Sequence, residues 1–253
     1  MKVCVVAATV MLALMPRAAL ASAPDAPDEV APATPKTSPG RVQFTANATL
    51  LSDYRFRGTS YSLGKAVAQA SLVASHDSGL FAGVYASSLS HHPVDGAVEV
   101  DLFAGYAKAV TPTITAEATL YYYYYPDANP AFPHTNAFET TLQLTGDFGA
   151  FMPKLGIWYA WDQATLGDRD NVYLFGDLGW RVPKTVFDAK LHAGYTHGAY
   201  SIAASHKTVD WSAGVGFWPV HNIRFGLDYV GISRPKIKNF SDDTVVASLS
   251  FDF

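Results

Sequence analysis

The residues of this chain that could do chemistry are charged side chains spaced two positions apart. The clearest case is the run Asp53-Tyr54-Arg55-Phe56-Arg57-Gly58. Its three charged residues, Asp53, Arg55 and Arg57, occupy alternate positions, which we call the same parity. Successive side chains of a strand point to opposite faces, so these three would form one row on a single face. The row is either a constriction that selects anions locally or a set of salt bridges to acidic residues of neighbouring strands. We favour salt bridges, because acids outnumber bases on that face and buried charges are usually paired.

The same parity collects charges along the rest of the chain, on what would be the inner face of a closed barrel. The predicted pore-lining residues are Asp53, Arg55, Arg57, Glu99, Asp101, Glu117, Glu139, Asp177, Arg181, Asp188, Lys190, Asp210, Arg224 and Asp228. His192 and Asp252 have the same parity. A net acidic lining predicts a lumen that favours cations or polar neutral solutes. The alternative is a plugged interior in which the carboxylates pair with the arginines.

Other reactive side chains form no recognisable site, so we predict no catalytic residue, no metal and no cofactor. His91 and His92 with Asp95 lack the ligand set of a metal site, and solvated loop histidines explain them better. A Ser/His hydrolase barrel is the enzymatic alternative, with Ser201, Ser205 and His206 in one loop. No nucleophile elbow or orienting carboxylate accompanies them, and we predict that the chain is not an enzyme.

Period-two alternation is the dominant pattern of the chain, and it is clear in the last ten residues, Thr244 to Phe253. A strand of about ten residues crosses a bilayer when it is tilted by roughly 45°. About twelve such segments follow Arg41. Their expected bounds are 42–57, 65–76, 80–90, 98–110, 113–125, 136–148, 154–164, 171–182, 186–197, 208–218, 223–230 and 244–253.

The connections between these segments alternate between short and long. Tight turns are expected after the second, fourth, sixth, eighth and tenth segments, and longer loops rich in Gly, Pro and His after the others. This rhythm is typical of periplasmic turns and extracellular loops, with both termini periplasmic. We therefore predict an all-β fold, a transmembrane antiparallel up-and-down barrel of about twelve strands over residues 41–253.

Composition and targeting signals place this barrel in the cell envelope. Residues 1–23 carry Lys2, an apolar run and Ala21-Ser22-Ala23, which predicts a secretory signal peptide. Residues 24–40 are rich in Pro and Ala, which predicts a disordered linker. The single cysteine, Cys4, lies in the signal, and the chain after it carries 16 basic and 22 acidic residues, a net charge of −6. Such a chain has no basic field for nucleic acid.

Aromatic residues fall where interface girdles of a membrane barrel would lie. The expected girdle residues are Tyr54, Phe56, Tyr122, Tyr124, Tyr159 and Trp161 at the outer end, and Trp180, Phe187 and Phe217 at the periplasmic end. The chain ends on an aromatic, Phe253, which we predict to act as the assembly signal of the barrel.

The segment Leu51–Ser62 (LSDYRFRGTSYS) resembles the opening signature of the TorF family of outer-membrane porins. Three later blocks, 65–71, 78–87 and 98–106, resemble those that follow it in the family. The chain departs at Tyr61, where the family signature would have Gln. The resemblance implies an envelope barrel of the porin kind, and it implies no catalytic residues and no defined substrate.

These observations predict a porin of the bacterial outer membrane, as in Gram-negative cells, that allows passive diffusion of small polar or cationic solutes. The expected partners are outer-membrane lipid, the barrel assembly machinery and the solutes, with no nucleic acid. The alternative is a non-conducting structural or adhesive barrel whose extracellular loops bind a partner. A membrane-embedded hydrolase is the weakest alternative.

Overall fold

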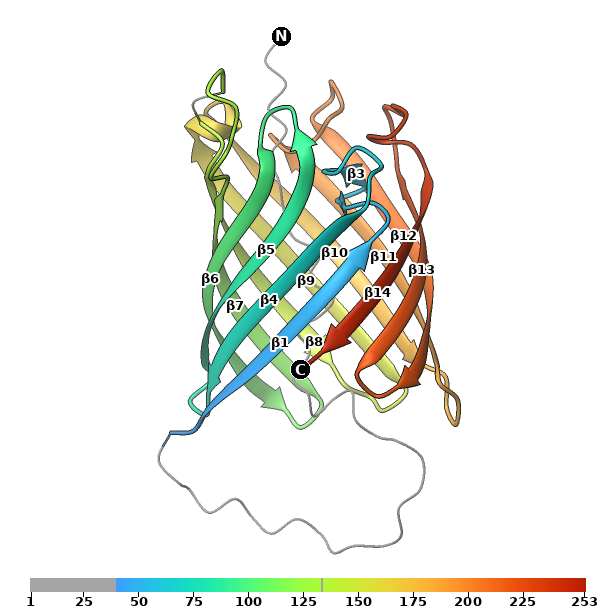
Figure 1. The fold of residues 1–253 in the computed structure, drawn as a ribbon. Coiled ribbons are helices and arrows are strands. Elements are labelled where there is room, and N and C mark those ends of the chain that lie inside the picture. Colours follow the sequence, from blue (N-terminus) through green and yellow to red (C-terminus); the bar gives the residue numbers. More distant parts are fainter. Residues whose placement is uncertain (1–39, 133) are drawn as a thin grey trace, which may run out of the picture.

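The computed structural model describes residues 40–132 and 134–253, and twelve of its strands form one closed antiparallel barrel (Figure 1). These strands are β1 (Val42–Leu51), β4 (Val67–His76), β5 (Leu80–His92), β6 (Gly96–Thr111), β7 (Ile114–Tyr124), β8 (Ala137–Gly146), β9 (Phe151–Gln163), β10 (Arg169–Arg181), β11 (Phe187–Gly198), β12 (Lys207–Val220), β13 (Ile223–Ile232) and β14 (Thr244–Asp252). Two short strands, β2 (Arg55–Phe56) and β3 (Thr59–Ser60), form a separate hairpin, and Ala164–Leu166 is a turn of 3₁₀ helix. The predicted all-β fold and strand number are confirmed.

The barrel closes where the first strand pairs with the last. β1 runs antiparallel to β14 with Asn47 opposite Asp252 and Leu51 opposite Ser248. Backbone hydrogen bonds between Ala46 and Phe253, 2.9 and 3.2 Å long, continue this ladder to the end of the chain. β1 also pairs with β4, across the short strands β2 and β3, and from β4 to β14 each strand pairs with the next along the chain. The barrel therefore has no free strand edge.

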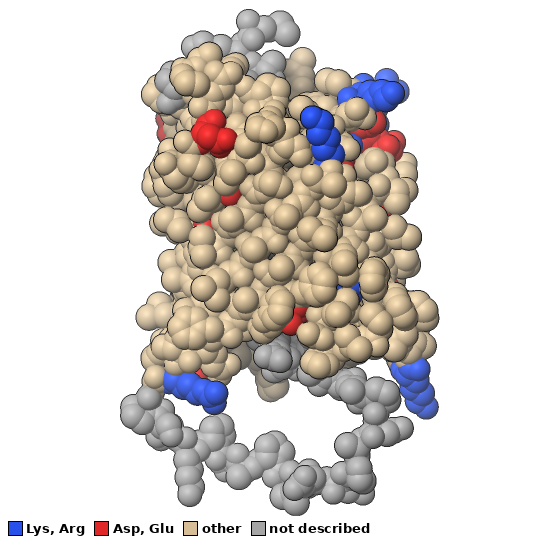
Figure 2. All heavy atoms as spheres, in the orientation of Figure 1, with Lys and Arg blue, Asp and Glu red and all other residues tan. Residues whose placement is uncertain are grey.

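Polar and apolar residues alternate along each barrel strand, and so do buried and exposed side chains. The reason is that each side chain of the closed sheet points either into the barrel or away from it. On β12, Thr208 and Asp210 are buried, whereas Val209 and Trp211 are 44% and 37% exposed. Large exposed apolar side chains of this kind occur on every barrel strand. On the face shown in Figure 2, charged residues gather at the two ends, and the band between is almost free of them. A surface of this kind suits a lipid environment.

The short turns and the long loops lie at opposite ends of the barrel (Figure 1). The predicted tight turns are all present, for example 77–79 and 221–222. One predicted long loop is wrong: β5 and β6 continue beyond the expected bounds, with His92 opposite Gly96, and only residues 93–95 connect them. The other long connections include 125–136, 199–206 and 233–243.

The predicted extent of the first strand is also wrong. β1 ends at Leu51 rather than Arg57, and the chain then turns into the barrel as the inner hairpin, residues 53–62, which contains β2 and β3. All ten of these residues are buried. Tyr54 and Phe56, predicted to lie in the outer girdle, are 0% and 8% exposed. In this hairpin, charged and aromatic residues alternate in sequence as polar and apolar residues do in a barrel strand. The sequence pattern alone therefore cannot distinguish a buried hairpin from a barrel strand.

Five other predicted girdle residues point outward, as expected: Tyr124, Tyr159, Trp180, Phe187 and Phe217 are between 39% and 53% exposed. The predicted signal peptide lies outside the described residues, as does the predicted linker apart from Gly40. Within the described ranges, no helix is both long and apolar enough to cross a membrane.

A charge placed on the outer face should be costly in proportion to its depth in a bilayer. Leu142, in the middle of β8, is 60% exposed, and Val110, beside a short turn, is 55% exposed. We expect Leu142→Arg to lower the free energy of unfolding by about 2–4 kcal/mol in lipid vesicles, and Val110→Arg by about 0–1 kcal/mol. Urea titration of the refolded variants measures both. Equal losses would contradict the depth assignment.

Candidate functional site

The candidate functional site is the interior of the barrel, and the inner hairpin fills its outer end. Asp53 organises this hairpin: its Oδ1 accepts hydrogen bonds from the hydroxyls of Ser60 and Ser62, and its Oδ2 lies 2.6 Å from Arg55 Nε. Arg57 and Gly58 take positive φ angles of 46° and 78° at the tip. Glycine adopts such angles at no steric cost, so Gly58 lets the chain reverse inside the bore.

Arg55 ties the hairpin to the outer loop between β13 and β14. Its Nη1 donates to the backbone oxygen of Asp242 at 2.7 Å, and its Nη2 to the carboxylate at 3.0 Å. The backbone N–H of Ser60 donates to Phe240 O at 2.7 Å. Slight desolvation raises the pKa of Asp242, but the hydrogen bond from Arg55 outweighs it and holds the pKa below its usual value. The tie is therefore present at neutral pH and is lost as the pH falls through that lowered pKa.

Arg57 ties the hairpin to the opposite wall. Its Nη2 lies 2.8 Å from Glu139 Oε1 on β8, and both side chains are almost fully buried. Its guanidinium also lies over the rings of Phe56 at 4.4 Å, Tyr173 at 4.3 Å and Tyr200 at 5.2 Å. Cation–π contacts of this kind stabilise a desolvated cation. Arg57 therefore holds the hairpin in place through a salt bridge, which is the interpretation favoured from the sequence over an anion-selective constriction.

An aromatic layer packs the hairpin against β5 to β9. Tyr61 stacks on His92 with ring centroids 5.7 Å apart, and Tyr54 lies 5.6 Å from Tyr61. Further along the wall, Tyr121 packs against Trp158 at 4.8 Å. The hairpin tip reaches β12 and β13 on the other side, since a Cβ added at Gly58 would lie 2.6 Å from Ile232. The hairpin therefore spans the bore.

Below the hairpin, a cavity of about 1320 Å³ extends to the short-turn end of the barrel. Its walls come mainly from β1 and β9 to β14, and its upper boundary is the hairpin itself, at Asp53 and Arg55 to Gly58. It includes turn residues such as Thr185 and His221 but no described residue of the long outer loops. The lumen is therefore hollow toward the short turns and filled toward the long loops.

Ion pairs lie along the polar wall of this cavity. Arg224 donates two hydrogen bonds to the Asp188 carboxylate, 2.9 and 2.7 Å long. Trp218 Nε1 donates to the same carboxylate at 2.5 Å. Lys190 Nζ lies 2.9 Å from Asp228. Paired side chains of this kind keep their charge inside a protein at a lower desolvation cost than single ones.

Glycines on the inner face of β12 and β13 make room for these pairs. A Cβ at Gly214 would lie 1.8 Å from Asp228 Oδ1, and one at Gly216 would lie 2.3 Å from Asp188 Oδ1. The charged side chains can thus lie against the wall instead of crossing the bore.

The densest polar cluster centres on His192 of β11. Its Nδ1 lies 2.6 Å from Asp177 Oδ1, and its Nε2 lies 2.9 Å from Asp210 Oδ1 and 2.8 Å from the Tyr173 hydroxyl. Tyr173 also donates to Asp210 at 3.0 Å. This cluster connects the polar wall to the hairpin, because the Tyr173 ring also lies under Arg57. Both nitrogens of His192 are occupied by partners, which suits a fixed cation between two carboxylates.

The structure divides the predicted pore-lining residues into two groups. Ten of them line the cavity: Asp53, Arg55, Arg57, Asp177, Arg181, Asp188, Lys190, Asp210, Arg224 and Asp228. The other four, Glu99, Asp101, Glu117 and Glu139, point inward but are absent from its wall. Glu99, Asp101 and Glu139 are 0% exposed because the aromatic layer and the hairpin cover them. Lys154 and Lys184 line the cavity and were not predicted.

This division corrects the predicted charge of the lining. The cavity wall carries six aspartates and seven Lys or Arg residues, so it is nearly balanced and not net acidic. Parity identifies which side chains point inward, but it cannot show which of them another part of the chain covers.

The other reactive residues are not brought together into a site. Ser205 donates to Lys207 O, and His206 contacts Arg169, so the loop of the suggested hydrolase forms no triad. The expectation of a solvated loop histidine is wrong for His92, which ends β5 and is 5% exposed. Asp95 lies 3.0 Å from His92 Nδ1, and burial raises the pKa of Asp95. Within the described residues no group of His, Cys, Asp and Glu has the geometry to hold a metal ion.

Comparison with known proteins agrees with this architecture. A family model described as a bacterial protein of unknown function, Gcw_chp, matches residues 34–251. The chain belongs to this family. No curated protein matches the sequence.

Two solved structures share the fold at low sequence identity. KdgM porin is 7% identical with a TM-score of 0.56, over 83% of this chain and 98% of that one. NanC porin is 11% identical with a TM-score of 0.54, over 83% of this chain and 98% of that one. A further KdgM structure, in complex with disordered oligogalacturonate, is 7% identical with a TM-score of 0.54, over 83% of this chain and 97% of that one. At these identities the likeness concerns the fold alone.

Breaking the Arg57–Glu139 pair should destabilise the barrel strongly. Because both groups are buried, we expect Arg57→Met to lower the free energy of unfolding by about 3–5 kcal/mol, since it leaves a buried carboxylate unpaired. Adding Glu139→Gln should recover part of that loss. Urea titration in detergent measures the cycle.

The matched control is Lys236→Met, which breaks a pair whose side chains are 37% and 36% exposed and should cost about 0–1 kcal/mol. If the losses from Arg57→Met and Glu139→Gln simply add, the two side chains are not coupled.

Proposed function

We propose that this chain is a porin-like channel of the bacterial outer membrane that admits small polar solutes and is closed toward the outside by its inner hairpin. The observation that carries the proposal is a cavity of about 1320 Å³ with charged side chains on its wall, inside a barrel whose outer face is apolar. A solid interior would serve a purely structural barrel, whereas this cavity exceeds by far the volume of a single water, roughly 30 Å³.

The outer-membrane location is supported by the apolar outer face, by the twelve-strand fold shared with KdgM and NanC porins, and by the resemblance to the TorF family. In this proposal residues 1–23 direct export, residues 24–40 link the signal to the barrel, and Phe253 is the signal read by the assembly machinery. Lipid then contacts the exposed apolar side chains.

The solute class follows from the cavity wall. Six aspartates face seven Lys or Arg residues, most of them held in pairs, so the wall offers donors and acceptors without a strong field of one sign. We therefore propose small polar solutes in general and give up the predicted preference for cations. KdgM has been solved with oligogalacturonate, which makes polar carbohydrates a sensible first class to test here.

The filled outer end favours one alternative, a non-conducting barrel whose outer loops bind a partner. All ten residues of the hairpin are buried, and its ties reach both β8 and the β13–β14 loop. Conductance measurements on a variant without the hairpin separate the two functions.

Shortening the hairpin should open the channel. Leu51 and Val67 are register partners, so a four-residue turn such as Gly-Ser-Asp-Gly can replace residues 52–66. In planar bilayers we expect the wild type to conduct little and the shortened barrel to give discrete conductance at least several-fold larger. The shift in gel mobility between unheated and boiled samples establishes that both variants fold.

A folded, shortened barrel with no conductance at any voltage would overturn the channel and favour the partner-binding alternative. The double variant Arg55→Met with Arg57→Met is a second test, because it removes both ties and keeps the chain length. We expect it to give intermediate, flickering conductance.

Conduction through the cavity should depend on the glycines of its wall. In the shortened barrel we expect Gly214→Val to reduce conductance about twofold or more, because the added side chain displaces Asp228 and Lys190 into the bore. The matched control is Ala213→Val on the outward face of the same strand. Equal effects of the two substitutions would show that solutes do not pass along this wall.

A further inference from the structure

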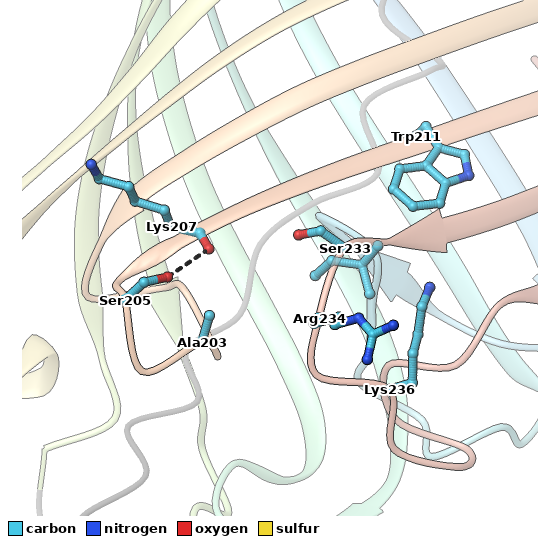
Figure 3. A pocket seen from close by; sticks show the side chains of 8 residues that line it. Ala203, Ser205, Lys207, Trp211, Ser233, Arg234 and Lys236 are labelled. Carbon is cyan, nitrogen blue, oxygen red and sulfur yellow. Dashed lines mark hydrogen bonds between the residues drawn. The ribbon is translucent and has the colours of Figure 1, made fainter.

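A second pocket lies outside the bore, at the long-loop end of the barrel (Figure 3). Its volume is about 560 Å³, and it lies between the β11–β12 and β13–β14 connections. Among the residues that line it are Lys207, Trp211, Ile232, Ser233, Arg234 and Lys236. Trp211 also borders the cavity below the hairpin, and Ile232 lies against the hairpin tip, but the channel and its closure use none of the other lining residues.

The pocket belongs to the outer surface of the barrel. Lys207 and Trp211 have the outward parity of β12, opposite to the buried Thr208 and Asp210. The Trp211 indole lies directly over Gly231, where a Cβ would be 2.6 Å from the ring. A tryptophan held flat at the end of the apolar band is in the position that interface tryptophans occupy in membranes.

The pocket carries positive charge that the protein leaves uncompensated. Lys236 is balanced by Asp243, and its Nζ lies 5.2 Å from the centre of the Trp211 ring. Lys207 and Arg234 have no ion pair within the described part of the chain. In Figure 3, Arg234 and Lys236 lie close together, and Lys207 lies on the opposite rim with its ammonium directed away from them. Two separate cationic positions therefore flank one pocket.

Apolar side chains continue directly from the pocket toward the middle of the barrel. Tyr229, opposite Ala213, is 47% exposed, and Val245, opposite Tyr229 on β14, is 59% exposed. A ligand that fits both parts needs an anionic head beside the cations and an apolar body along the barrel wall. Phospholipid-like molecules have this construction, whereas a soluble phosphate satisfies only half of it.

We infer that this pocket binds the phosphate-bearing headgroup of an outer-leaflet lipid, with Arg234 and Lys207 as the phosphate ligands and Trp211 beside the acyl chains. Arginine and lysine both suit this role, since charge-assisted contacts to phosphate are the strong class of hydrogen bonds. The two cations lie on opposite rims of the pocket (Figure 3), which favours a headgroup with more than one phosphate. The inference rests on the proposed outer-membrane location and is independent of conduction.

The test uses the full-length mature chain refolded in detergent, with bis-phosphorylated lipid A as the probe and native mass spectrometry as the readout. We expect Lys207→Ala with Arg234→Ala to weaken lipid binding about tenfold or more, as expected for the loss of two charge-assisted contacts. The control pair is Arg41→Ala with Lys108→Ala, two exposed cations at the short-turn end. That pair should change binding less than twofold.

Equal weakening by both pairs would overturn the site, because it would show only a general effect of charge. Dephosphorylated lipid A that binds as well as the bis-phosphorylated form would overturn the phosphate contact. Inorganic phosphate that competes at micromolar concentration would overturn the lipid and indicate a soluble anion. Conductance is recorded separately on the barrel shortened at residues 52–66, so that a shortened barrel that binds lipid without conducting contradicts only the channel.

Discussion

Closure of the backbone ladder between β1 and β14 is the constraint on which the rest of the structure depends. Once Asn47 pairs with Asp252 and Leu51 with Ser248, every barrel strand has two neighbours. Each side chain is then committed to the inside or the outside by parity alone. The apolar outer band and the charged side chains on the inner wall both follow from this one division. A slip of one residue between β1 and β14 would set the inward side chains of one strand beside the outward side chains of the other.

The inner hairpin uses this enclosed space in a way that parity does not determine. It brings Asp53, Arg55 and Arg57 into the bore, and each charge finds a partner there or close by: Asp53 with Arg55, Arg55 with Asp242, and Arg57 with Glu139. The last pair contains two nearly inaccessible side chains, whereas Asp242 is partly exposed. Unpairing a buried charge costs far more than breaking an exposed pair. The contact with Glu139 is therefore the main resistance to any movement of the hairpin out of the bore.

Much of this architecture could be predicted from the sequence, because a barrel repeats one simple rule along its whole length. Strands such as β12 and β14 alternate so regularly that their faces and bounds were predicted to within about two residues of the structure. The rule failed at 53–62, where Asp, Tyr, Arg, Phe and Arg alternate but both faces are buried. What distinguishes this hairpin from a strand is long-range: Asp53 bonds to Ser60 and Ser62, and Arg57 reaches 82 positions along the chain to Glu139. Local periodicity carries no information about such contacts.

The same limit explains why the charge of the lumen was mispredicted although its residues were placed on the correct face. Glu99, Asp101 and Glu139 point inward as expected, and the hairpin with its aromatic layer then removes them from the cavity. What remains is an asymmetric bore, with aromatic packing along β5 to β9 and paired charges along β10 to β13. The glycines at 214 and 216 keep those pairs against the wall, so the open path follows the charged side. In the proposed channel, a solute that enters from the short-turn end would pass the His192 cluster before it meets the underside of the hairpin, where the Arg57 guanidinium lies over the Tyr173 ring.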